Sequence, residues 1–97
     1  MSNRGRKPQW ERLYCSDGFN MSVQAGASHY SNPRSDVGPW TEFEVGMPSD
    51  WDVLLIPYAE EPNRPTETIY GWVPLNVIKG VVQNHGGLRN GGDYPWE

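Results

Sequence analysis

Cysteine and long apolar segments are nearly absent from this 97-residue chain, which has one cysteine and no aliphatic run longer than residues 53–56. A lone cysteine cannot form an internal disulfide, which fits a reducing compartment. A membrane-spanning helix needs about 20 apolar residues, so the sequence predicts no transmembrane segment. The first residues are polar and basic, unlike a secretory leader. We therefore expect a protein that remains in the cytoplasm where it is made.

Catalytic and metal-binding motifs are also lacking. Cys15, His29 and either Asp17 or Asp36 supply the residue types of an activated thiol nucleophile. Cys15, however, falls on the inward face of an expected strand, where a free cysteine is usually a small buried hydrophobe. Cys15, His29 and His85 also do not show the paired spacing of zinc ligands. We therefore expect no enzyme activity, no cofactor and no metal.

Charge is distributed unevenly along the chain, whose formal net charge is −4. Residues 36–67 carry eight carboxylates against one base, Arg64, whereas residues 1–12 carry four bases against Glu11. The length is that of one small domain. We expect residues 1–97 to form a single domain, with a basic arm at residues 1–9, a core at residues 10–87 and a glycine-rich tail at residues 88–97.

Alternating apolar and polar residues predict a hairpin near the start of the core. Residues 19–25 follow the period of two that is typical of a half-buried strand. A two-residue turn before this strand would place Tyr14 opposite Met21, whereas a three-residue loop at residues 16–18 would place Leu13 there. We favour the three-residue loop because its last residue is a glycine, which suits a left-handed bulge position.

A long loop and a third strand are expected next. Residues 26–39 are rich in Gly, Ser, Asn and Pro and predict the loop. Residues 40–47 predict a strand with apolar side chains on one face and acidic side chains on the other, namely Phe43, Val45 and Met47 against Glu42 and Glu44. Paired carboxylates can serve a hydrolase. An exposed acidic stripe is the commoner arrangement, so we expect Glu42 and Glu44 to face solvent.

The second half of the core predicts two strands and a helix. Residues 53–58 and 69–73 can pair around a Pro-rich loop, with Pro57 marking an edge or an early end. Residues 49–56 can instead form a short helix with a serine cap and acidic residues in its first turn. Residues 75–84 show helical spacing of apolar residues and precede a glycine pair.

These elements predict an α+β fold in which one C-terminal helix packs on an antiparallel sheet of four or five strands, flanked by extended arms. The expected core consists of Phe19, Met21, Val23, Phe43, Val45, Ile69, Val73, Ile78 and Val81.

Several short motifs follow one another between residues 13 and 87: YCSDGF, MSVQA, HY, NPR, GPW, VGMPS, PYAE, YGWVP and HGG. This set resembles a family of small proteins encoded by tailed bacteriophages and prophages. Ser31 stands where the family pattern has a second cysteine, which argues against a metal or redox pair with Cys15. The resemblance implies a phage origin and action in the host bacterial cytoplasm, where small acidic phage proteins often inhibit host machinery.

The acidic, tryptophan-containing stretch predicts a binding surface. Tryptophan anchors supply affinity, and carboxylates accelerate the encounter with a basic partner. The same field repels nucleic acid and anionic membranes, so we expect a protein partner with a basic surface, such as a host defence complex (an anti-CRISPR-like role) or a transcription complex. The charges would also suit a surface that is merely soluble. The expected contact residues are Trp40, Glu42, Glu44, Asp50, Trp51 and Asp52.

An alternative function is a structural or accessory virion protein. Trp10 lies beside the basic arm, while Tyr94 and Trp96 lie at the tip of the tail. A solvated tail usually lacks such aromatic anchors. The tail therefore either folds back on its own domain or straps a neighbouring copy in a homo-oligomer or a virion.

Overall fold

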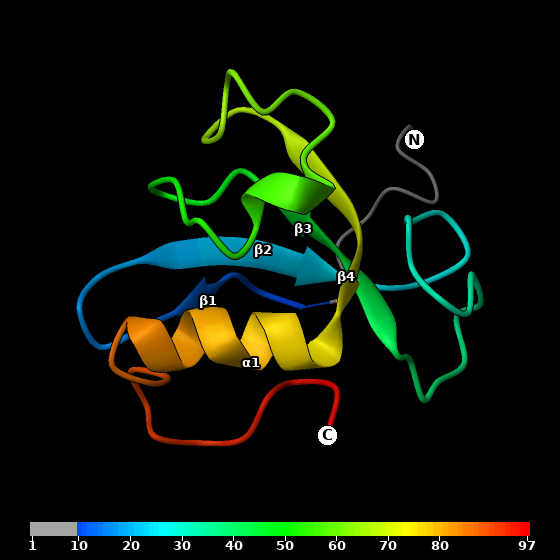
Figure 1. The fold of residues 1–97 in the computed structure, drawn as a ribbon. Helices are drawn as coiled ribbons and strands as arrows, with labels where there is room; N and C mark the ends of the chain where they lie inside the picture. Colours follow the sequence, from blue (N-terminus) through cyan, green and yellow to red (C-terminus); the bar gives the residue numbers. More distant parts are fainter. Residues whose placement is uncertain (1–9) are drawn as a thin grey trace.

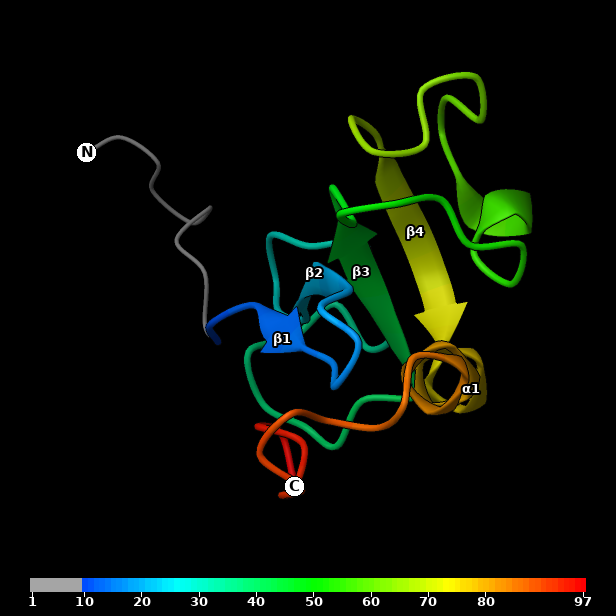
Figure 2. The ribbon, with the colours of Figure 1, turned by 90° about the vertical axis from the view of Figure 1, so that its left-hand side faces the viewer.

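Residues 10–97 form a four-stranded antiparallel sheet with one helix against it, as a computed structural model shows (Figures 1 and 2). The strand order is β1 (Leu13–Tyr14), β2 (Asn20–Gln24), β3 (Glu42–Gly46) and β4 (Ile69–Pro74), followed by helix α1 (Leu75–Asn84). The predicted α+β class is confirmed. The predicted basic arm, residues 1–9, lies outside the described residues. No helix in the described part of the chain is long and apolar enough to cross a bilayer.

The hairpin β1–β2 has the predicted three-residue loop. Leu13 pairs with Met21, and Gly18 adopts the left-handed conformation with φ +99°. The carboxylate of Asp17 accepts the backbone N–H of Phe19 at 2.9 Å, which stabilises the turn locally. Leu13 and Met21 are both buried, so this register places the apolar face of the hairpin in the core.

Strand β3 lies within the predicted residues 40–47, but the chain leaves the sheet earlier than expected. Phe43 and Val45 are fully buried in the core. Met47 was expected to join them and is instead about half exposed, because its φ of +42° turns the chain away from the strand. The prediction of Met47 as an inward residue is therefore wrong.

A bulge in β4 changes which of its residues reach the core. Val73 pairs with Phe43 and Tyr70 pairs with Val45, so two residues of β4 lie opposite one residue of β3. Tyr70 is consequently fully buried, and Ile69, which was expected in the core, is only partly buried. One of these two residues is Trp72, which has a left-handed φ of +51°.

Trp72 is exposed, and contacts with Tyr30 hold its left-handed backbone conformation. Its N–H donates to the carbonyl of Tyr30 at 3.0 Å, and the two rings stack with centroids 4.9 Å apart. Residues 29 and 30 of the long loop therefore cover part of the sheet face opposite α1.

Residues 53–58 do not form the predicted strand, and residues 49–56 do not form the alternative helix. They form a turn followed by a 3₁₀ helix, η1 (Ile56–Tyr58). The carboxylate of Asp52 accepts the N–H of Leu54, and its carbonyl accepts the N–H of Leu55. This local bonding competes with strand pairing. In place of the predicted second hairpin, the structure has a single antiparallel bridge between Ala59 and Tyr70.

The predicted helix is confirmed as α1, which buries Ile78, Val81 and Val82 against the sheet. The tail then folds back on its own domain rather than away from it (Figure 1). The N–H of Arg89 donates to Tyr14 at 2.8 Å, and the ring of Trp96 packs on Phe43 at 4.5 Å between centroids. The aromatic tip of the tail therefore closes the core.

Candidate protein-binding loop

The six expected contact residues do not form one surface. Only two of them, Asp50 and Trp51, are exposed. Trp40 and Glu42 are partly buried, while Glu44 and Asp52 are buried.

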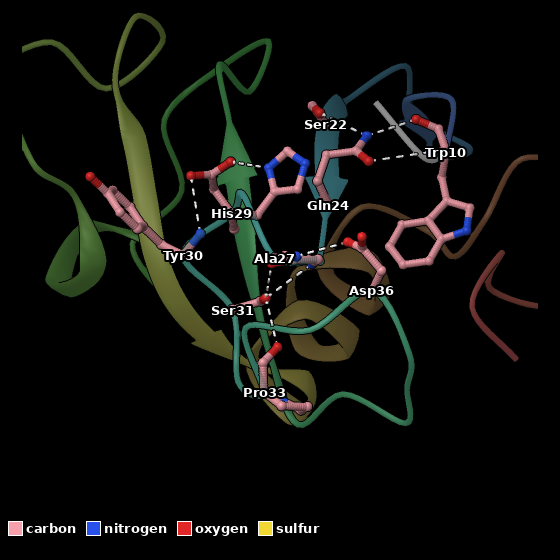
Figure 3. A network of polar contacts seen from close by, with 11 residues as sticks. Trp10, Ser22, Gln24, Ala27, His29, Tyr30, Ser31, Pro33 and Asp36 are labelled. Atoms are coloured by element: carbon pink, nitrogen blue, oxygen red, sulfur yellow. Dashed lines mark hydrogen bonds and ion pairs between the residues drawn. The ribbon is translucent and has the colours of Figure 1, made fainter. Parts of the chain in front are cut away.

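Glu44 is the clearest correction to the predicted surface, because its side chain is only 8% exposed. One carboxylate oxygen lies 2.8 Å from Nδ1 of His29, and the other accepts the N–H of Tyr30 at 3.4 Å (Figure 3). The alternation of β3 correctly predicts that Glu44 lies on the sheet face opposite Phe43 and Val45. The expectation of a solvent-facing Glu44 is wrong because residues 29 and 30 cover that face of the sheet.

Trp40 is held inside the domain by contacts on two sides. Its indole Nε1 donates to the carbonyl of Ser35 at 2.8 Å, and its ring meets that of Trp10 edge to face at 5.4 Å. A Cβ at Gly38 would lie 2.7 Å from the Trp40 ring, so this position requires glycine. These contacts assign Trp40 to the packing of the long loop.

Residues 49–55, hereafter the 49–55 loop, combine exposed apolar side chains with a fixed backbone. Trp51 is 58% exposed and Val53 is 66% exposed, and Leu54 is also exposed. At one end, Ser49 bonds Asn20 through both its N–H and its hydroxyl. At the other end, Leu55 is fully buried in the core. The apolar side chains between these anchors therefore project from a backbone that is held at both ends.

A histidine fixes the middle of this loop. His85 ends α1, and its two ring nitrogens contact two carboxylates: Nδ1 lies 2.7 Å from Asp17, and Nε2 lies 2.9 Å from Asp52. The imidazole also stacks on Phe19 with ring centroids 4.0 Å apart. We call Asp17, His85 and Asp52 the His85 clamp. It joins the β1–β2 turn, the end of α1 and the 49–55 loop.

The charge state of His85 follows from this geometry. Two carboxylates facing both ring nitrogens require two N–H donors, which only the imidazolium has. Burial lowers the pKa of His85, but the hydrogen bonds to Asp17 and Asp52 and their negative charges raise it more, so the pKa lies above its ordinary value. The pKa of Asp17 is lowered by the Phe19 N–H and by His85.

Sequence reasoning missed this clamp. The sequence places Asp17 in the 16–18 loop or beside a thiol nucleophile, and it offers His85 as a zinc ligand without the required spacing. The two residues are separated by 68 positions, and no spacing in the sequence indicates that they meet.

Exposed carboxylates lie in the 49–55 loop and shortly after it in the sequence. Asp50, Glu60 and Glu61 are exposed, and within residues 10–97 none of them forms an ion pair. Arg64, the one base of residues 36–67, pairs with Glu67. Residues 10–97 hold no group of three or more acidic, histidine or cysteine side chains that could bind a metal ion.

Comparison of the chain with known protein families, with curated proteins and with solved structures finds no match.

Proposed function

We propose that this protein is a non-enzymatic binding module that docks its 49–55 loop on a basic surface of a protein partner. The observation that carries the proposal is the exposure of Trp51, Val53 and Leu54 on a loop anchored by Leu55 and by the His85 clamp. The resemblance to phage proteins supports a phage-encoded inhibitor of a host nucleic-acid-binding complex as the biological role.

Preorganisation is the physical reason to favour this loop. Ordering a flexible loop on binding costs free energy, and a loop that is already held avoids much of that cost. A tryptophan that enters a partner pocket typically dominates an interface, with neighbouring apolar residues excluding water. Asp50 and the exposed glutamates add a negative field that accelerates encounter with a basic surface.

The contact set of this proposal differs from the one expected from sequence. Asp50 and Trp51 keep their predicted roles, and Val53 and Leu54 join them. Asp52 acts indirectly because it holds the loop through His85.

A partner captured from host lysate would be tested by surface plasmon resonance against two matched variants. Trp51→Ala should accelerate dissociation and weaken binding by about 30-fold, the equivalent of about 2 kcal/mol. Val37→Ala removes a side chain that is 75% exposed on the long loop and should leave binding unchanged. Neither variant should shift the thermal midpoint, because both side chains are largely in solvent.

Ionic strength gives a second readout. Association should slow as salt rises from about 0.01 M to about 0.1 M, where the screening length falls from about 30 Å to about 10 Å. Salt-independent association together with unchanged dissociation of Trp51→Ala would contradict the proposal. Capture of virion components or of the protein itself would instead favour the strap function.

A further inference from the structure

The His85 clamp lies where three segments of the chain meet. The β1–β2 turn approaches the C-terminal end of α1 (Figure 1), and the backbone N–H of Asp17 donates to the carbonyl of His85 at 3.2 Å. The 49–55 loop reaches the same imidazole through the carboxylate of Asp52. This contact is therefore a polar link between the proposed docking loop and the end of α1.

Asp52 also organises the backbone of the 49–55 loop. Its Oδ1 accepts the N–H of Leu54 at 2.9 Å, and its carbonyl accepts the N–H of Leu55 at 3.0 Å. The other carboxylate oxygen, Oδ2, is the one that contacts Nε2 of His85. The strength of the bond to the imidazole therefore affects how firmly this turn is held.

The two carboxylates of the clamp differ in their access to water. The side chain of Asp17 is 50% exposed, whereas that of Asp52 is 7% exposed. The imidazolium donates to both, but a neutral imidazole has only one N–H, so loss of a proton must break one of the two bonds. Water can solvate Asp17 and hardly reaches Asp52, so the remaining N–H belongs on Nε2. The bond to Asp52 then persists without the attraction of the positive charge.

The other titratable groups around the clamp keep their charge near neutral pH. Asp50 shares a hollow with the imidazole and is ionised above about pH 5. Cys15 faces one carboxylate of the clamp and Tyr70 faces the other, and burial raises the pKa of both, so they are neutral. Arg89 faces Cys15 and is always charged. The last turn of α1 has no basic residue, and its dipole favours a cation at its end. The imidazole is therefore the group of this cluster that changes its charge in this range.

We propose that the proton on His85 controls the opening of the 49–55 loop. With the proton bound, the imidazolium holds Asp52, and the loop stays closed on the end of α1. When the proton leaves, Asp17 turns to solvent, the bond to Asp52 weakens and the loop opens more often. The proposal rests on the proposed function in treating this loop as the docking surface. A partner that selects the closed loop binds more weakly by the fraction of loops that are open.

NMR of the isotopically labelled full chain tests the proposal without a partner. At pH 6 both ring nitrogens of His85 should carry protons, and at pH 9 only Nε2 should keep one. The opening constant of the loop is obtained from the exchange rates of the Leu54 and Leu55 amides, each divided by the rate for an unstructured peptide at the same pH. This constant should increase by about fivefold between pH 6 and pH 9, because a hydrogen bond between two charged groups is replaced by a weaker one.

Three variants identify the group that is responsible. His85→Gln has no titrating group at this position, so its opening constant should be independent of pH. Asp17→Asn can still accept the N–H of Phe19 through its amide oxygen, but it removes one of the two negative charges that favour the imidazolium. The rise in opening should therefore move to lower pH. Asp93→Asn removes an exposed carboxylate of the tail and should leave the pH and the size of the change unaltered.

An opening constant that does not change with pH in the folded wild type, or a change that persists in His85→Gln, would overturn the proposal. A proton that remains on Nδ1 instead of Nε2 at pH 9 would also overturn it. These measurements involve neither Trp51 nor a partner. Failure of the switch would leave the binding test of Trp51→Ala unaffected, and failure of that binding test would leave the opening constants unaffected. The two proposals can therefore fail independently.

Discussion

Replacement of His85 by glutamine would test the clamp that holds the 49–55 loop. Glutamine is similar in reach and is uncharged, so it can donate to Asp17 or to Asp52 while losing the charge-assisted contacts to both. The Asp52 side chain is only 7% exposed and would keep its negative charge without the imidazolium. The variant should therefore fold but be less stable than the wild type.

The magnitude follows from the two surroundings of the imidazole. A hydrogen bond to a buried charged group contributes about 1.5–3 kcal/mol, which applies to the contact with Asp52. Loss of the stack on Phe19 adds about 0.5–1 kcal/mol. We expect His85→Gln to lower the free energy of unfolding by about 2–4 kcal/mol, with a fall in the thermal midpoint of about 10 °C or more for a domain of this length.

The pH dependence of this loss has a definite sign. The folded-state pKa of His85 lies above the unfolded value of about 6.5, so protonation stabilises the folded state. The contribution is complete below pH 6.5 and is lost as the pH rises through the elevated folded-state pKa. The difference in unfolding free energy between wild type and His85→Gln should therefore be larger at pH 6 than at pH 9.

Urea unfolding followed by tryptophan fluorescence at pH 6, 7.5 and 9 would measure this difference. Subtracting the variant from the wild type cancels other groups that titrate in this range, including Cys15 and Tyr70, whose pKa values are raised first by burial. A difference that is constant with pH, or that grows toward pH 9, would refute the assignment of a doubly protonated His85.

Three further predictions concern single positions. Glu44→Gln should lower the free energy of unfolding by about 2 kcal/mol, because it weakens the buried contact with His29. Glu42→Gln, at a partly exposed position, should change it by less than about 0.5 kcal/mol. Chemical denaturation would compare the two variants, and equal effects would contradict the burial of Glu44. Trp72→Gly should be more stable than Trp72→Ala by about 1 kcal/mol. Both variants lose the ring stack, but only alanine keeps the free-energy cost of a left-handed backbone at this position. Calorimetry that shows the reverse order would contradict this explanation. Cys15 should react with a thiol reagent at pH 8 far more slowly in the folded protein than in urea, because burial removes access and raises the pKa of its thiol; equal rates would contradict its placement in the core.

The β1–β2 turn and helix α1 could be predicted directly from the sequence. The three-residue turn before β2 followed from a glycine at the position that needs a left-handed backbone, and the register of Leu13 with Met21 followed from that loop length. Helix α1 followed from apolar residues at helical spacing with glycines behind them. In both cases the decisive interactions join residues that are close in the sequence.

Burial of the second sheet face could not be read in the same manner. The alternation of β3 assigns Glu44 to the face opposite Phe43, but it does not tell whether water or another segment covers that face. The 26–39 loop places His29 over Glu44, and the composition of a loop does not specify its path. Whether an acidic side chain is exposed therefore depends on the tertiary structure. For that reason Glu44 does not belong to the acidic face that the sequence predicts.

The sequence by itself determined the α+β class, the hairpin register, the terminal helix and the presence of an acidic stretch containing Asp50 and Trp51. Only the tertiary structure decided that Tyr70 replaces Ile69 in the core and that His85 joins Asp17 to Asp52. The bulge at Trp72 and the His85 clamp both depend on contacts between segments far apart in the chain. Such contacts leave no periodic signal, because the free energy that favours them arises only after the segments have packed together.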